Sequence, residues 1–156
     1  MHLEPLKQWI CDTCGEIIQS PDEGYVQFID ENSEGKWSDF VIVHHAQFSP
    51  RTGNNKCYRE GYSDFPLSEF LGADGLSRLI GLIDPGEFYF KELRVPRTSN
   101  FRKWVTLVRR LQTPYYEEAR LYFGKAKNDG VFAGLNEVAP YRVDFLRNII
   151  ETYGEE

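Results

Sequence analysis

Two cysteines near the start of the chain have the spacing of half a metal site. The stretch "QWICDTCGEII", residues 8–18, separates Cys11 from Cys14 by two residues, places glycine directly after them, and flanks them with residues typical of strands. A C-x-x-C-G sequence folds as a tight turn in which two thiolates converge on one point, and Gly15 supplies the positive φ angle that this turn favours. The sequence therefore predicts a turn that contributes two of the four ligands of a metal ion.

The remaining two ligands must come from one further cysteine, Cys57, and three histidines. His2 belongs to a chain end that we expect to be mobile, which leaves His44 and His45. Because neighbouring side chains of a strand point to opposite faces, only one of this pair can reach the ion. The alternation alone does not choose between them, since both sets of alternating neighbours are apolar. We favour His44 and expect the other histidine to orient a ligand by a hydrogen bond.

A structural zinc ion normally takes four thiolate and imidazole ligands in a tetrahedron. The predicted ligands of a structural Zn²⁺ are Cys11, Cys14, Cys57 and one of His44 and His45. Three other interpretations remain open: small buried cysteines without a metal, a redox dithiol, and a nucleophilic pair of Cys57 with a histidine. A redox motif usually opens a helix, whereas strand residues and a turn follow here, and a thiolate bound to zinc is not free to attack.

Residues 9–58 resemble the zinc-ribbon and treble-clef proteins, in which a C-x-x-C-G knuckle on a hairpin pairs with two later ligands. The resemblance implies a structural zinc ion. The second ligand pair departs from the commonest pattern, because it is a histidine and a cysteine separated by a long loop. No specific family is recognised in the rest of the chain, and zinc folds of this kind host many unrelated functions.

The elements around the knuckle are predicted from their periodicity and their turn residues. Residues 24–45 contain two β-rich runs around a polar loop, which predicts an antiparallel hairpin, and residues 46–57 are rich in Ser, Pro, Gly and Asn, as in an exposed loop. From residue 63 onwards the pattern is mainly helical. The expected elements are a helical turn in 63–72, helices over 73–83, 100–112, 114–128 and 140–153, and a strand over 87–95.

Each expected helix carries an apolar stripe that should face the core. We expect Asp74 to cap the first of these helices. The four stripes, in chain order, are Leu76, Leu79, Ile80 and Ile83; Phe101, Trp104, Val105, Val108 and Leu111; Tyr115, Ala119, Tyr122 and Ala126; and Val143, Leu146, Ile149 and Ile150.

With 156 residues, 41% of them apolar, the chain can bury a core of its own without disulfides. The expected fold class is α+β: an N-terminal zinc-bound antiparallel β-hairpin module, residues 1–62, packed on a mainly helical part, residues 63–156, and sharing one core with it. No apolar run approaches the roughly 20 residues of a membrane span, and three cysteines do not make a disulfide framework. We therefore expect a cytoplasmic protein without a membrane partner.

The net charge of −6 is unevenly distributed along the chain. Residues 1–90 carry 6 basic and 15 acidic side chains, residues 91–127 carry 10 and 3, and residues 128–156 carry 2 and 6. The acidic part argues against nucleic-acid contact through the metal module, whereas the basic middle segment is suited to bind phosphate. The two parts can equally attract each other.

Four basic side chains should lie on one side of the helix over 100–112, because residues seven apart return to nearly the same direction. These residues are Arg102, Lys103, Arg109 and Arg110, and the face could be widened by Lys91, Arg94, Arg97, Lys125 and Lys127. A solvated face paired with the acidic part is the simpler interpretation. Nucleic-acid binding through this face is the alternative.

Two adjacent histidines followed by asparagines invite comparison with the histidine-asparagine-histidine nucleases. No third histidine follows on a helix, so a metal-dependent nuclease is a weaker hypothesis. A helix-turn-helix over 67–83 would present too many apolar side chains to a DNA groove. The leading prediction is a non-enzymatic zinc-binding protein that acts as an adaptor for another protein.

Overall fold

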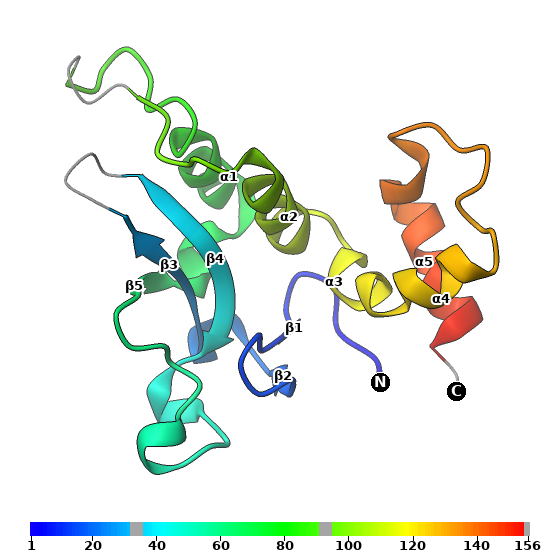
Figure 1. Ribbon diagram of the computed structural model, residues 1–156, viewed down its shortest axis with the longest axis horizontal. Coiled ribbons are helices and arrows are strands. Elements are labelled where there is room, and N and C mark those ends of the chain that lie inside the picture. Colours follow the sequence, from blue (N-terminus) through cyan, green and yellow to red (C-terminus); the bar gives the residue numbers. More distant parts are fainter. Residues whose placement is uncertain (32–35, 91–94, 155–156) are drawn as a thin grey trace.

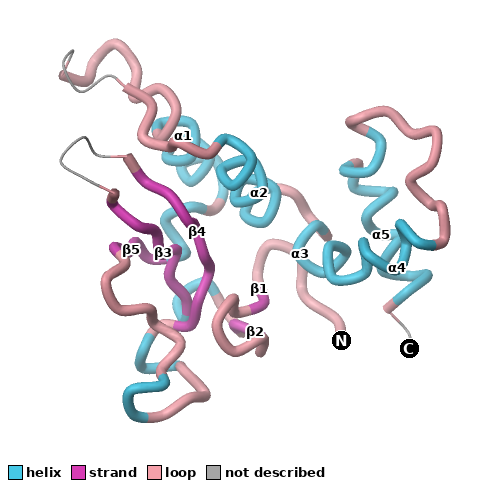
Figure 2. The backbone as a smooth tube through the Cα atoms, in the orientation of Figure 1, coloured by secondary structure: helices cyan, strands magenta, loops and turns pink. Residues whose placement is uncertain are grey.

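The computed structural model describes residues 1–31, 36–90 and 95–154 and has the predicted α+β architecture (Figure 1). A two-stranded antiparallel sheet pairs β1 (Trp9–Ile10) with β2 (Ile17–Ile18). A three-stranded antiparallel sheet has the order β4-β3-β5. In both ribbon and tube views, α1 and α2 lie beside the three-stranded sheet, and α3, α4 and α5 lie away from it (Figures 1 and 2).

The predicted hairpin over residues 24–45 is confirmed as β3 (Gly24–Asp30) paired with β4 (Trp37–His44). Its register changes between Gln27 and Ile29, where β4 has one extra residue and Asp39 has a φ angle of 53°. This is the geometry of a β-bulge.

The segment that begins at residue 63 was expected to start with a helical turn, and that prediction is wrong for its first four residues. Ser63–Pro66 is strand β5, which pairs with β3, and the helical turn is the 3-10 turn Leu67–Phe70. Strand β5 lies at the sheet edge, where proline is tolerated because it has no backbone N–H to donate. Pairing with β3 thus overrode the local pattern.

Helix α1 (Gly72–Gly81) begins earlier than predicted, and its cap is Leu71 rather than Asp74. Its buried face is also different: Leu79 and Leu82 are buried, whereas Leu76 and Ile80 are 39% and 50% exposed. The reason is the close packing of Gly75, where an added Cβ would lie 2.0 Å from the carbonyl carbon of Phe70. This contact turns the face of residues 75, 79 and 82 inward and the predicted stripe partly outward.

Helix α2 (Phe101–Gln112) begins one residue later than predicted, because Asn100 is its cap: the Asn100 side chain accepts a hydrogen bond from the Lys103 backbone N–H at 3.1 Å. The side chains of Leu107, Arg110 and Leu111 are its buried ones. Phe101, predicted to be buried, is 57% exposed.

The helix predicted over 114–128 is interrupted. It consists of α3 (Tyr116–Ala119), a 3-10 turn (Arg120–Tyr122) and α4 (Phe123–Asn128). Tyr115 stands before α3 with a φ angle of 69°, which no residue inside an α-helix has.

The last helix, α5 (Val143–Tyr153), begins three residues later than predicted, after the 3-10 turn Ala139–Tyr141. It ends before Gly154, as the sequence predicts. Leu146, Ile149 and Ile150 are buried as expected, but Val143 is exposed.

The strand predicted over 87–95 is wrong for its described part, because residues 87–90 form a turn; residues 91–94 lie outside the described residues. The aromatic composition there resembles a strand, yet Phe88 is 97% exposed. Gly86, at a φ angle of 84°, begins a turn in which the Tyr89 N–H donates to the Gly86 carbonyl at 3.4 Å, so the chain bends here instead of extending.

Buried apolar residues form two clusters. The first joins both sheets with α1 and α2 and includes Cys11 and Cys57. The second lies within α3, α4 and α5 and their connections. The first cluster draws on both sides of the domain boundary expected between residues 62 and 63, and that boundary stays a prediction. Within the described residues, no helix combines the length and apolar character that a bilayer span requires.

Candidate metal centre

The predicted turn at Cys11 is present. The Cys11 backbone N–H donates to the Glu16 carbonyl at 2.9 Å, and the Gly15 N–H donates to the Cys11 carbonyl at 2.9 Å. Gly15 has the expected positive φ angle, 76°. Strands β1 and β2 flank this turn, and the thiols of Cys11 and Cys14 lie close together.

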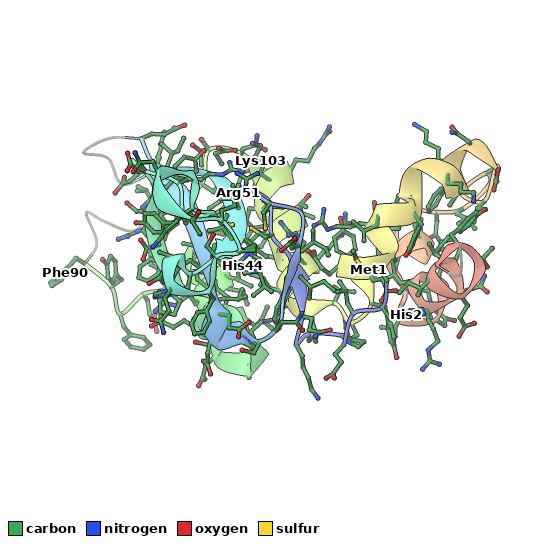
Figure 3. All side chains as sticks on the ribbon, turned by 90° about the horizontal axis from the view of Figure 1, so that it is seen from below. Met1, His2, His44, Arg51, Phe90 and Lys103 are labelled. Atoms are coloured by element: carbon green, nitrogen blue, oxygen red, sulfur yellow. The ribbon has the colours of Figure 1, made fainter. Side chains whose placement is uncertain are left out.

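The structure brings together four of the five predicted donors: Cys11, Cys14, His44 and Cys57. Their ligand atoms all lie within 4.8 Å of one another. Cys11, His44 and Cys57 are buried, and Cys14 is partly exposed. The donors come from the knuckle, the end of β4 and the loop before β5, and His44 lies inside the N-terminal part of the molecule (Figure 3).

His44 is oriented as a metal ligand would be. Its Nε2 lies 3.1 Å from the carbonyl oxygen of Ile17, which can only accept, so Nε2 carries the hydrogen. Nδ1 then carries the lone pair, which faces the Cys14 Sγ at 3.5 Å. In a tetrahedral site with Zn–S near 2.3 Å and Zn–N near 2.0 Å, sulfur and nitrogen ligands are roughly 3.5 Å apart. The observed separation therefore leaves room for an ion between them.

His45 lies on the other side of the strand end. Its ring packs against Tyr25, with centroids 4.5 Å apart, and its Nδ1 accepts a hydrogen bond from the Gln47 N–H at 3.2 Å. His45 thus caps the 3-10 turn Ala46–Phe48. The prediction that the second histidine orients a ligand is wrong for this contact.

Two hydroxyl groups fix the position of Cys57. Ser49 Oγ donates to the Cys57 Sγ at 3.1 Å and accepts from the Cys57 N–H at 3.1 Å. Thr13 Oγ1, inside the knuckle, donates to the Cys57 carbonyl at 2.9 Å. Neither contact was predictable, because a serine in a polar loop and a threonine in the knuckle carry no pattern that indicates a distant partner.

Three thiols and one imidazole converge in this cluster. Burial, together with the neighbouring thiols of Cys57 and Cys11, raises the pKa of the Cys14 thiol to about 12, although a hydrogen bond from the Glu16 backbone acts in the opposite direction. A divalent cation reverses this preference, since coordinated thiols are deprotonated. The chemistry of the donor set therefore fits a metal ion.

The prediction of a basic helix face is wrong for Arg110, which is 6% exposed. Lys103 forms an ion pair with Asp39 at 2.8 Å, and the guanidinium of Arg109 stacks 3.5 Å from the centre of the Tyr141 ring. Arg102 is exposed. The four residues thus do not form one free phosphate-binding surface.

The other basic residues considered for that face are dispersed. Lys91 and Arg94 lie outside the described residues. Arg97 donates to the Tyr89 hydroxyl at 2.9 Å, and Lys125 lies 5.6 Å from the centre of the Tyr153 ring. Lys127 is exposed on α4.

Arg110 is instead the centre of a buried ion network. Its Nε and Nη2 donate to the two carboxylate oxygens of Glu117, each at 2.7 Å, and its Nη1 donates to Asp12 at 2.7 Å. Burial would raise the pKa of Glu117, but hydrogen bonds from Arg110 and Arg120 outweigh it and lower that pKa to about 2. Glu117 therefore stays ionised although it is buried.

His2 lies away from the metal cluster, with its ring Nδ1 3.1 Å from Glu118 (Figure 3). Fold and site together define an α+β protein with a Cys₃His group that can hold a metal ion. Comparisons with protein-family models, curated proteins and solved structures each find no match to this chain.

Proposed function

We propose that Cys11, Cys14, His44 and Cys57 bind a structural Zn²⁺ ion. The convergence of these four donors within 4.8 Å carries the proposal. Sulfur and nitrogen donors in a compact group favour tetrahedral zinc over magnesium or calcium, which prefer oxygen. Four protein ligands complete the tetrahedron, so no position stays open for a reacting water or substrate.

The ion would cross-link segments whose own secondary structure is too short to be stable. Strands β1 and β2 have two residues each, and an isolated pair of short strands is at best marginally stable in water. The ligands tie this pair to the end of β4 and to the loop after Ala46–Phe48. Zinc would thus stabilise the fold around β1 and β2, which supports a non-enzymatic role.

The role that best suits such a module is protein interaction. Phe88 and Phe90 are 97% and 68% exposed, and Phe90 lies at one end of the molecule (Figure 3). Exposed aromatic side chains of this kind favour contact with another protein. Nucleic-acid binding is less well supported, because Arg110 is buried and Arg109 is stacked on Tyr141.

Elemental analysis of the purified protein tests the zinc proposal. We expect one zinc per chain, lost in Cys57→Ser and in His44→Ala. The matched control is His45→Ala, which removes the neighbouring imidazole and should keep the zinc. A metal-free protein whose melting temperature does not respond to strong chelators would refute the proposal.

Affinity capture tests the adaptor role. A specific partner should bind the wild type and lose binding in the double variant Phe88→Ser with Phe90→Ser. Val138→Ser, which changes an exposed apolar residue elsewhere, is the control. Catalytic turnover that disappears on chelation would contradict a non-enzymatic role.

A further inference from the structure

The two hydrophobic clusters meet at a polar contact. The Ile10 N–H donates to Glu117 at 3.1 Å, and the Leu3 N–H donates to Glu118 at 2.8 Å. On the side of the first cluster, the Trp9 indole donates to the Arg110 carbonyl of α2 at 3.0 Å. Both glutamates are buried and belong to α3. Polar contacts of this kind, unlike large apolar ones, allow two bodies to move relative to each other.

Arg110 joins the two sides of this contact. Its guanidinium binds Glu117 on α3 through two hydrogen bonds, and on the opposite side it binds Asp12 at 2.7 Å and the Ile10 carbonyl at 3.1 Å. We call Asp12, Arg110 and Glu117 the joint. Because a buried guanidinium needs partners for its donors, the joint is complete only when both carboxylates are in place.

Asp12 lies inside the metal knuckle, between Cys11 and Cys14. Its N–H donates to the Ile42 carbonyl at 2.8 Å, and its carboxylate accepts from the Ile42 N–H at 2.7 Å. Ile42 precedes the ligand His44 by two residues on β4. The position of the Asp12 carboxylate therefore depends on the same knuckle and strand that supply the metal donors.

The charges of the joint balance only in this arrangement. Arg120 binds Glu117 at 2.8 Å and lies 4.0 Å from Asp12, so two carboxylates face two guanidinium groups. If the knuckle loosens and Asp12 withdraws, two cations share the carboxylate of Glu117. A buried charge without its partner destabilises the contact that contains it.

We infer that the joint couples metal occupancy to the docking of α3, α4 and α5, an inference that rests on the proposed zinc site. Loss of the ion frees the knuckle, Asp12 leaves Arg110, and α3 detaches from β1 and α2. The C-terminal helices keep their own core, because the second cluster contains none of the metal donors. Coupling is reciprocal, so weakening the joint also weakens metal binding by the same factor.

Hydrogen exchange and zinc competition on the full chain test the inference. Chelation of the wild type should speed amide exchange in Tyr116–Ala119 by about tenfold or more, within the usual range of coupling factors, and leave α5 protected. In Arg110→Met and in the milder Asp12→Asn, zinc affinity measured against a competing chelator should fall by a similar factor. In these two variants, amide exchange in α3 should be fast with or without zinc.

Arg102→Met, an exposed arginine on the same helix, is the control and should behave as the wild type. Unchanged zinc affinity in both joint variants, or α3 exchange that ignores chelation, would overturn the coupling while the zinc site stands. Loss of protection throughout α5 on chelation would also overturn it, because the ion would then hold the whole fold. A protein that contains no zinc would instead remove the proposed function.

Discussion

The two parts of this molecule are held together by different means. The N-terminal part includes the two-residue strands β1 and β2 beside the three-stranded sheet, and two of the cysteine donors are members of its hydrophobic cluster. The C-terminal part, α3 to α5, is held by aromatic and aliphatic packing, with Ala119, Ala126 and Leu146 fully buried. The comparison shows where an ion would act: β1 and β2, which flank the knuckle, are too short to be stable as an isolated pair, whereas the second cluster contains none of the metal donors.

Metal removal should separate the two parts most strongly. Structural zinc contributes roughly 10 to 16 kcal/mol of apparent binding free energy in small zinc modules. Cys57→Ser, or chelation of the wild type, should therefore unfold the N-terminal part and leave helical signal from the C-terminal part. Tryptophan fluorescence reports the loss, since Trp9 and Trp37 are in the N-terminal part, and far-ultraviolet circular dichroism reports the remaining helix. Simultaneous loss of both signals would contradict the distinction.

Glu117→Gln should weaken the contact between the parts. Breaking a buried ion pair destabilises by about 3 to 5 kcal/mol. Because the folded-state pKa of Glu117 is lowered to about 2 from its usual 4.5, its stabilising effect is complete above pH 4.5 and is lost as pH falls toward 2. The difference in unfolding free energy between wild type and variant should shrink over that window.

Urea unfolding at pH 7 and at stepwise lower pH measures this difference. Glu151→Gln, an exposed glutamate on α5, serves as the control. A difference that stays constant down to pH 2 would show that Glu117 is not held ionised by Arg110.

Leu146→Ala should act on the C-terminal part alone. Leu146 is fully buried in the second cluster, and truncation of such a leucine costs about 2 to 5 kcal/mol. Zinc content should stay at the wild-type value while the stability measured by urea falls. Val143→Ala, which changes an exposed residue of the same helix, should have little effect. Loss of zinc in Leu146→Ala would mean that the two cores are not separate.

Asn100→Ala should have the smallest effect. It removes the side-chain cap of α2, which is typically worth about 1 kcal/mol. Thermal unfolding measures it, and Ser99→Ala, one residue earlier and without a capping hydrogen bond, is the matched control. Equal melting temperatures for Asn100→Ala and the wild type would show that the cap contributes nothing measurable.

Features set by neighbouring residues were predictable from the sequence. The turn at Gly15, the hairpin of β3 and β4, and the end of α5 at Gly154 each follow from a local signal. Cys11, Cys14 and Cys57 could be predicted as donors because the chain has only three cysteines.

Features set by contacts with residues far along the chain were not predictable from the sequence. The hydroxyl of Ser49 beside Cys57 and the pairing of Ser63–Pro66 with β3 depend on contacts that no local pattern encodes. The same is true of Arg110, which the sequence places on an exposed basic face and the structure places between Asp12 and Glu117.

The sequence by itself determined that a thiol knuckle precedes a β-hairpin and that helices follow. Tertiary structure decided which faces of these elements meet. His44 rather than His45 joins the cysteines because β4 turns that face toward Ile17, and α1 buries Leu79 because Gly75 packs against Phe70. Periodicity determines that an element has two faces, and only the surrounding packing determines which face is buried.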